Sequence, residues 1–107
     1  MFARMLEFTP RMDKKDEFVK VLKNEILPVL KKQSGFLETL PLFPETKNEK
    51  MVVISLWTAK RDAEKYDRDV FPKVAETLKP FLLTPIEMRV YAVETTLCEH
   101  FVNALAA

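Results

Sequence analysis

Apolar and polar residues alternate along the chain with two different periods, and each change of period predicts the boundary of an element. Residues 1–8 and 51–57 carry apolar side chains on both faces, which is typical of strands in the centre of a sheet. Residues 36–43 and 86–93 predict two further strands, and residues 44–50 predict a polar hairpin loop. The pattern therefore predicts four strands.

The first helix is predicted between the first two strands, from about Lys14 to Gln33. Asp13 is expected to cap its N-terminus, and Gly35 is expected to end it in the left-handed conformation. Pro28 is expected to kink the helix rather than end it, because the apolar spacing continues past the proline. The buried stripe of this helix consists of Phe18, Leu22, Ile26, Val29 and Leu30.

The second helix is predicted directly after the third strand, with Thr58 as its N-cap. Pro72 is expected to break it near residues 69–71, and Pro80 and Pro85 are expected to end the helical region. The buried stripe of this helix consists of Ala63, Tyr66, Val70, Val74, Leu78 and Phe81.

Joined in order, these elements give β-α-β-β-α-β, the ferredoxin-like α+β arrangement of an antiparallel sheet with both helices on one face. We expect this domain to occupy residues 1–94, followed by a C-terminal tail over residues 95–107 with helical apolar spacing. Because the helices cover only one face, a monomer would leave the apolar residues of the other face in water. We therefore expect a homodimer that packs sheet against sheet.

Charge and length exclude several classes of partner. The 107 residues include 17 Lys and Arg and 16 Asp and Glu, which leaves a net charge of +1 and no excess for nucleic-acid or membrane-surface binding. No apolar run approaches the roughly 20 residues of a membrane span, and the N-terminus does not resemble a signal peptide. With Cys98 as the single cysteine, a cytoplasmic protein is expected.

The inventory of chemical groups also excludes several kinds of enzyme. His100 is the only histidine, and no nucleophile-elbow spacing surrounds a serine, so a catalytic triad is not expected. Gly35 is the only glycine, which excludes Gly-rich phosphate loops and dinucleotide fingerprints. Cys98, Glu99 and His100 have no second cluster to complete a metal site. We expect neither a metal nor a cofactor.

A motif at the end of the third strand carries a resemblance to a known family. Trp57 ends the strand, residues 58–63 (TAKRDA) begin a helix directly after it, and Tyr66 follows on that helix. Residues 33–37 (QSGFL) look like the family's turn from the first helix to the second strand. On these motifs the chain resembles the antibiotic biosynthesis monooxygenase domain family over residues 1–94.

The resemblance implies a dimeric α/β barrel, in which two sheets pack face to face and each subunit has a pocket between its helices and its sheet. The family includes cofactor-independent monooxygenases of aromatic polyketides, quinol monooxygenases, haem-degrading monooxygenases and proteins without an established activity. In the haem-degrading branch an Asn, a Trp and a His recur at positions that hold Glu7, Tyr66 and Glu76 here. Because a carboxylate is a poor axial ligand for haem iron, we expect no haem.

The resemblance favours a cofactor-independent monooxygenase acting on a small aromatic hydroxyl or quinol compound. Such a substrate supplies the electrons itself, so the protein has to bind it, orient it and help to deprotonate it. Trp57 and Tyr66 are the candidate substrate-binding walls, and Tyr66 is also a candidate catalytic donor. Arg89 is the candidate cation that stabilises the anion, and Glu7 is the candidate base if burial raises its pKa. We expect Trp57, Tyr66 and Arg89 to line one cavity. The alternatives for the cation and the base are Arg4 and Glu38.

Each candidate also has a purely structural interpretation. Trp57 and Tyr66 fit a core beneath the second helix, and Arg89 fits an ion pair with Glu87 on the same strand face. On that interpretation the chain is a non-catalytic small-ligand-binding or stress-related dimeric barrel protein. A wholly apolar pocket without Arg89, Glu7 or Tyr66 would favour this second interpretation.

Overall fold

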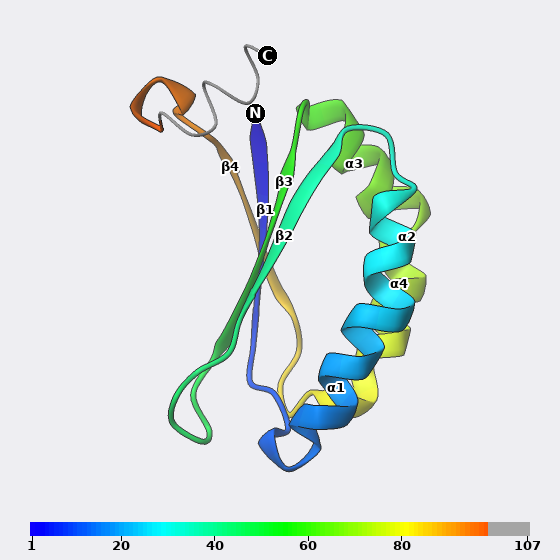
Figure 1. Ribbon diagram of the computed structural model, residues 1–107, viewed down its shortest axis with the longest axis vertical. Helices are drawn as coiled ribbons and strands as arrows, with labels where there is room; N and C mark the ends of the chain where they lie inside the picture. Colours follow the sequence, from blue (N-terminus) through cyan, green and yellow to red (C-terminus); the bar gives the residue numbers. More distant parts are fainter. Residues whose placement is uncertain (99–107) are drawn as a thin grey trace.

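The computed structural model describes residues 1–98 and has two layers (Figure 1). Four antiparallel strands form one sheet in the order β2-β3-β1-β4. Two helical arms, residues 12–31 and residues 60–81, lie on the same side of that sheet. The predicted ferredoxin-like order β-α-β-β-α-β is confirmed.

The register of the strands decides which side chains face the helical arms. The strands are β1 (Phe2–Phe8), β2 (Phe36–Leu42), β3 (Met51–Trp57) and β4 (Glu87–Ala92), each within one residue of its predicted bounds. Arg4 of β1 pairs with Ser55 of β3 on the helical side. Alternate residues point away from the helices. We call this second side the open face, and it carries Met5, Glu7, Ile54, Glu87, Arg89 and Tyr91.

The first helical arm is continuous but irregular. It consists of η1 (Met12–Lys14), α1 (Lys15–Val21), the π-helical turn η2 (Leu22–Ile26) and α2 (Leu27–Lys31). Asp13 lies inside η1 and caps neither η1 nor α1, so the predicted N-cap is wrong. Pro28 has no N–H for the preceding turn, and its ring crowds the carbonyl four residues earlier. The wider π turn relieves this crowding, so the arm continues past the proline, as predicted.

Gly35 ends the first arm in the left-handed conformation, with φ +78°, as predicted. Its carbonyl accepts a 2.8 Å hydrogen bond from the N–H of Thr58 at the end of β3. A Cβ atom at this position would overlap the carboxylate of Asp62 on the second arm. The turn therefore needs glycine both for its backbone angle and for space.

The second helical arm breaks where Pro72 predicts. It consists of α3 (Lys60–Asp69), α4 (Phe71–Leu78) and η3 (Lys79–Phe81). Ala59 occupies the N-cap position of α3, so Thr58 is not the cap, contrary to the prediction. The Thr58 hydroxyl instead donates to Oδ2 of Asp62 at 3.3 Å. Thr58 therefore joins the second arm to the Gly35 turn, because its N–H binds the Gly35 carbonyl and its hydroxyl binds Asp62 of α3.

A cluster of aromatic rings fills the core at one end of the molecule. Phe18 of α1 is fully buried and stacks on Phe81 of the second arm, with ring centroids 5.1 Å apart. Phe43 meets Phe18 edge-on at 5.9 Å, and Phe8 of β1 lies 6.2 Å from Phe18. These contacts join both arms to the sheet. They close this end of the space between the layers.

Neither helical arm covers the open face (Figure 1). Leu40, Leu42 and Tyr91 are 39%, 50% and 48% exposed there. Of the predicted tail, the structure describes a 3-10 turn, η4 (Thr95–Leu97), and residues 99–107 lie outside the described part of the chain. Over residues 1–98, no helix is long and apolar enough to cross a bilayer.

Candidate functional site

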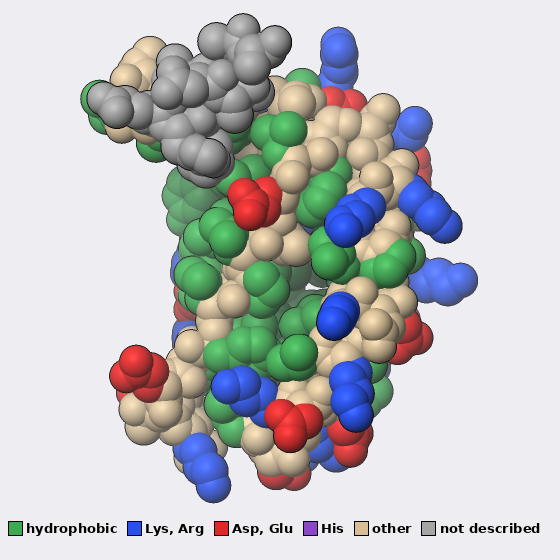
Figure 2. All heavy atoms as spheres, in the orientation of Figure 1, with side chains coloured by type: hydrophobic (Ala, Val, Ile, Leu, Met, Phe, Trp, Pro, Cys, Tyr) green, Lys and Arg blue, Asp and Glu red, His purple; other side chains and the backbone are tan. Residues whose placement is uncertain are grey.

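A cavity of about 500 Å³ lies between the first helical arm and the sheet. Figure 2 shows its mouth as a hollow bordered by apolar side chains, between the strands and the helices. Most of the wall is apolar and comes from both arms and from β1, β2 and β3, including Leu6, Ile26, Leu30, Phe36, Val53 and Phe71. A site of this kind suits a small, largely apolar ligand.

The irregular helix shapes one wall of this cavity. Leu22 and Ile26 of the π turn, and Leu27 and Leu30 of α2, all line it. Because one π turn adds a residue to the helical period, it changes which side chains follow the same face on either side of it. Pro28, which favours that turn, therefore influences the shape of the cavity without lining it.

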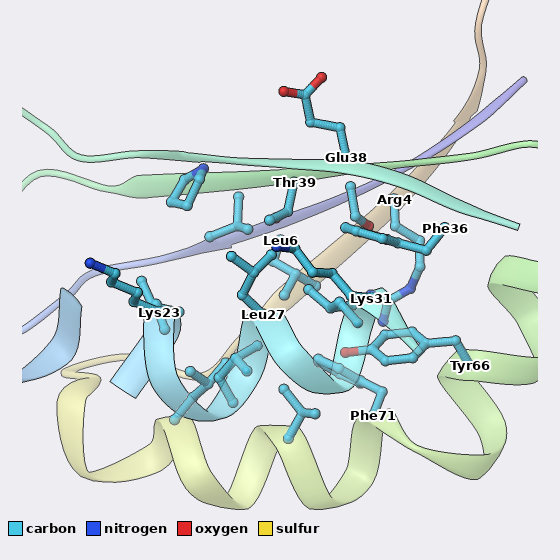
Figure 3. Close-up of a pocket in the computed structure, with 18 of the residues that line it drawn as sticks. Arg4, Leu6, Lys23, Leu27, Lys31, Phe36, Glu38, Thr39, Tyr66 and Phe71 are labelled. Atoms are coloured by element: carbon cyan, nitrogen blue, oxygen red, sulfur yellow. The ribbon is translucent and has the colours of Figure 1, made fainter. Parts of the chain in front are cut away.

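Arg4 forms a buried, charged end to the predominantly apolar cavity (Figure 3). Only 3% of this residue is exposed. Its Nη2 donates to Oδ1 of Asp67 on α3 at 2.6 Å, and its guanidinium lies 4.4 Å from the Phe71 centroid and 5.2 Å from the Tyr66 centroid. Its buried Nε–H has no acceptor among residues 1–98. The guanidinium therefore lacks a full set of acceptors, which is costly for a buried cation.

Tyr66 lies beside Arg4 and points its hydroxyl into the cavity (Figure 3). The residue is 3% exposed. Burial raises the pKa of Tyr66 to about 12, an effect that Arg4 partly offsets and Asp67 reinforces. Tyr66 is thus a protonated hydrogen-bond donor at neutral pH.

Trp57 does not line the cavity but supports it from behind. Its ring centroid lies 5.1 Å from that of Tyr66, and the residue is fully buried. Its indole Nε1–H donates to Oγ of Ser55 at 3.0 Å, rather than to a backbone carbonyl. Ser55 itself lines the cavity. Trp57, which was expected to form a wall of the cavity, therefore lies behind it and contacts the lining residue Ser55.

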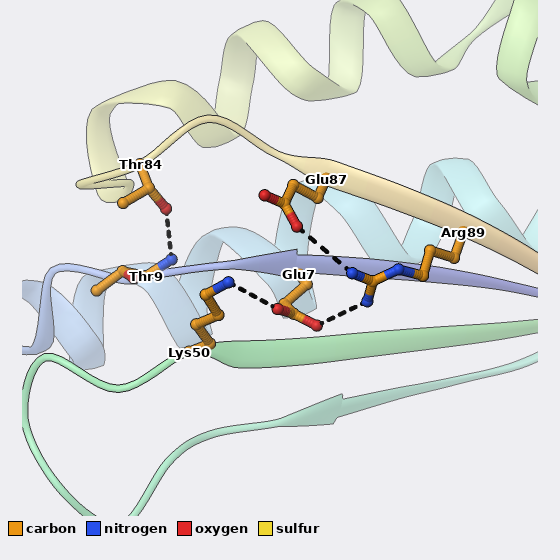
Figure 4. Close-up of polar contacts among 6 residues, drawn as sticks. All are labelled: Glu7, Thr9, Lys50, Thr84, Glu87 and Arg89. Carbon is orange, nitrogen blue, oxygen red and sulfur yellow. Dashed lines mark hydrogen bonds and ion pairs between the residues drawn. The ribbon is translucent and has the colours of Figure 1, made fainter.

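Glu7 and Arg89 lie on the open face, on the other side of the sheet from the cavity (Figure 4). Glu7 accepts from Lys50 at 3.0 Å and from Arg89 at 3.1 Å, and Arg89 also contacts Glu87 at 3.7 Å. The prediction that Arg89 shares one cavity with Tyr66 and Trp57 is therefore wrong. The reason is strand parity, since Arg89 pairs with Met5 and points the opposite way from Arg4.

None of the carboxylates proposed from sequence faces the cavity. The hydrogen bond from Lys50 lowers the pKa of Glu7, which is the opposite of the rise that a base would need. The Glu38 side chain points away from the cavity (Figure 3). Glu76 of α4 is exposed and does not line the cavity. In the described part of the chain, no three Cys, His, Asp or Glu residues gather as metal ligands, and His100 lies outside it.

Two polar residues of the cavity, Arg4 and Ser55, were only weakly indicated as site residues by the sequence. Arg4 was only the alternative cation, because a strand with two apolar faces does not reveal which face is covered. Ser55 lacks nucleophile-elbow spacing and gives no other motif, although it is the one hydroxyl in an otherwise apolar strand. Together with Tyr66 they form what we call the polar end of the cavity, defined as Arg4, Ser55 and Tyr66.

Comparison with known proteins identifies the family. The sequence model described as antibiotic biosynthesis monooxygenase matches residues 1–68 of the chain. The chain belongs to the antibiotic biosynthesis monooxygenase family. The matched residues hold all three members of the polar end. No match was found among proteins with curated descriptions.

Solved structures of antibiotic biosynthesis monooxygenase relatives share the fold. SnoaB, a cofactor-independent oxygenase from Streptomyces nogalater, is 20% identical with a TM-score of 0.72, over 91% of this chain and 96% of that one. The monooxygenase ActVA-Orf6 of Streptomyces coelicolor, solved with nanaomycin D, is 14% identical with a TM-score of 0.70, over 87% of each chain. A conserved protein from Methanosarcina mazei is 18% identical with a TM-score of 0.67, over 88% and 94%. At these identities the likeness concerns the fold.

Proposed function

We propose that the chain is a monooxygenase that oxidises a small aromatic hydroxyl or quinol compound with O₂ and without a bound redox cofactor. The observation that carries this proposal is the polar end of the cavity. A buried, incompletely paired guanidinium stands there beside a protonated phenol, at the end of a cavity with aromatic and aliphatic walls. Membership of the antibiotic biosynthesis monooxygenase family supports the same reaction class.

The reaction begins with the anion of the substrate. A phenolate oxygen at the polar end is stabilised by the Arg4 charge and by hydrogen bonds from Tyr66 and Ser55, which lowers the pKa of the bound phenol. Among the described residues that line the cavity, Glu38 is the one carboxylate, and its side chain points away (Figure 3), whereas Asp67, which pairs with Arg4 at 2.6 Å, does not line it. The phenolic proton therefore leaves to water rather than to a protein base.

The electrons come from the substrate and the oxygen atom comes from O₂. For a dihydroxyarene, the anion reduces O₂ and a new carbon–oxygen bond forms at a ring carbon that loses its hydrogen. The ring is oxidised to a hydroxyquinone, and the second oxygen atom of O₂ leaves as water. One O₂ is consumed for each hydroxyquinone, and no hydrogen peroxide is produced. Simple autoxidation differs, because it yields a quinone without an inserted oxygen and releases hydrogen peroxide.

Oxygen uptake with a dihydroxynaphthalene tests the proposal. We expect uptake above the buffer rate, insertion of one atom from isotopically labelled O₂, and no oxygen returned by catalase. Tyr66→Phe and Arg4→Met should each lower kcat/KM by about tenfold or more, because each removes a group that stabilises the anion. Arg61→Met, an exposed arginine of α3, is the matched control and should leave kcat/KM unchanged. A parent rate equal to that of buffer would refute the proposal.

The second candidate function is binding without turnover. It is favoured by the predominantly apolar lining of the cavity and by the orientation of Glu38, the one carboxylate among its described lining residues, whose side chain points away from it. A dihydroxynaphthalene would then quench Trp57 fluorescence on binding, while oxygen uptake stays at the buffer rate. Oxygen uptake above the buffer rate with the bound dihydroxynaphthalene would exclude binding without turnover.

We further propose that the chain acts as a homodimer, formed through the open face, in the cytoplasm. Exposed Leu40, Leu42 and Tyr91 support this, together with the part-buried Met5 and Ile54 between them. Glu7, Lys50 and Arg89 pair with one another on the same face, and they offer charges of both signs for pairing across a two-fold axis. The balanced charge of the chain and its single cysteine support the location.

A further inference from the structure

The helical wall of the cavity ends in two lysines. Lys23 of the π turn and Lys31 of α2 both line the cavity. They are eight residues apart, which is about 12 Å along a helix. Figure 3 shows both side chains on the helical side of the cavity, with Lys23 at the end away from Arg4 and Lys31 nearer to it. The cavity thus has cations at its mouth as well as at its polar end.

These two lysines have no acidic partner among residues 1–98. Lys50 and Lys60, in contrast, pair with Glu7 at 3.0 Å and with Glu64 at 3.7 Å. Glu38 of β2 borders the same cavity, but its carboxylate points away from it (Figure 3). The charge at the mouth is therefore positive and unneutralised by the described residues around it.

The lining of the cavity changes from its polar end to its mouth, and each part fits a different chemical group of a ligand. A hydroxyl group fits beside Arg4 and Tyr66, and rings fit between the apolar walls. An anionic group fits at the mouth, where it keeps most of its water and gains attraction from two ammonium groups. A neutral group there would gain nothing from the lysines.

We infer that the ligand of this cavity is an aromatic hydroxyl compound with a carboxylate at the opposite end, recognised by Lys23 and Lys31. This inference rests on the proposed function for the hydroxyl end and adds the charge of the other end. Because the lysines are exposed, their contribution is modest and depends on salt. We expect the pair to strengthen binding of the carboxylate by about threefold to tenfold.

Two probes that differ only in charge separate this contribution from apolar binding. One is a hydroxynaphthoic acid with its hydroxyl and carboxyl groups at opposite ends, and the other is its methyl ester. Affinities are measured by quenching of Trp57 fluorescence, without O₂, at neutral pH and at low and high salt. We expect the acid to bind more tightly than the ester at low salt only, because salt screens the exposed charges.

Lysine variants test whether the mouth is responsible. In the double variant Lys23→Gln with Lys31→Gln, the acid should bind no better than the ester, while the ester keeps its parent affinity. The matched control is Lys65→Gln with Lys73→Gln, two exposed lysines of the second arm that do not line the cavity. This control should retain the full preference for the acid.

The outcomes distinguish this inference from the proposed function. Equal binding of acid and ester, or a preference that survives in the Lys23 and Lys31 variant, overturns the inference and leaves the oxygenase proposal standing. If the protein prefers the acid but oxygen uptake with the dihydroxynaphthalene stays at the buffer rate, the inference is supported and the oxygenase proposal is refuted. Failure of both probes to bind overturns the inference, and oxygen uptake with the dihydroxynaphthalene then decides the oxygenase proposal separately.

Discussion

The indole Nε1–H of Trp57 donates a 3.0 Å hydrogen bond to Oγ of Ser55, and both groups are buried. The two side chains leave β3 on the same face because they are two positions apart. With its oxygen accepting from the indole, the Ser55 hydroxyl keeps its own proton for an acceptor in the cavity. Trp57 therefore orients a donor of the polar end while its own ring stays in the core.

A double-mutant cycle measures this relationship. Trp57→Phe should lower the free energy of unfolding by about 1–3 kcal/mol through lost packing, and Ser55→Ala should lower it by about 1–2 kcal/mol by leaving the indole N–H unpaired. In the Trp57→Phe background, Ser55→Ala should cost about 1 kcal/mol less than in the parent. Urea unfolding provides the measurement. Strictly additive effects would show that the hydrogen bond does not link the two residues.

Stability at high pH depends on Tyr66. Burial raises the pKa of Tyr66 from 10.0 to about 12, so the folded protein holds the phenolic proton more tightly than the unfolded chain does. The resulting stability is fully present below pH 10 and is lost as the pH rises to about 12. The loss should amount to about 2 kcal/mol.

Between pH 10 and 12, the free energy of unfolding of Tyr66→Phe, measured by urea unfolding, should not show the decrease that is due to Tyr66. Tyr91→Phe is the matched control, because Tyr91 is 48% exposed on the open face. Its unfolding free energy should follow that of the parent across the same range. Identical curves for the parent and Tyr66→Phe would contradict the argument.

Replacing Gly35 with alanine should destabilise the fold by about 2 kcal/mol, because alanine is strained at φ +78° and its Cβ overlaps the Asp62 carboxylate. Thermal or urea unfolding measures the loss. In an Asp62→Ala background the cost should be smaller, because the carboxylate is gone and only the backbone strain and the closer contact with Cβ of residue 62, at 2.8 Å, remain. A Gly35→Ala variant as stable as the parent would show that the turn adjusts without cost.

The proposed homodimer should have about twice the 12.5 kDa chain mass in light scattering at micromolar concentration. Ile54→Lys should convert it to a monomer, because Ile54 lies between Met5 and Leu40 at the middle of the open face. Leu83→Lys is the control, since Leu83 is 50% exposed but lies outside the sheet. A soluble parent monomer at this concentration would refute the dimer.

Hemin titration should show no sharp Soret band of a ligated complex. Glu76 stands where the haem-degrading branch is expected to have its iron-binding His, and this residue is exposed on α4 and does not line the cavity. For the same reason, Glu76→His should not create a complex. A stoichiometric, submicromolar complex with the parent protein would show that the branch assignment is wrong.

Features that depend on neighbours along the chain were predictable from the sequence. The run of β-branched residues at 51–57 predicted β3 with its observed bounds, because a strand buried on both faces needs such side chains. Pro72 predicted the break between α3 and α4, and Gly35 predicted the left-handed turn, because both effects are properties of the local backbone. The helix caps at Asp13 and Thr58 were wrong, because the chain enters both helices through turns in which neighbouring residues take that place.

The composition of the polar end was decided only by the tertiary structure. Arg4 and Arg89 both lie in strands, and a shift of one position turns a side chain to the other side of a sheet. Pairing of β1 with β3 and β4 turned Arg4 towards Asp67, 63 positions away, and turned Arg89 towards Glu7. The same pairing brought Lys50 to Glu7 and lowered the pKa of the carboxyl that was expected to act as a base. Elements and family follow from local order, whereas the face, the partner and the pKa of each charged group follow from contacts between distant segments.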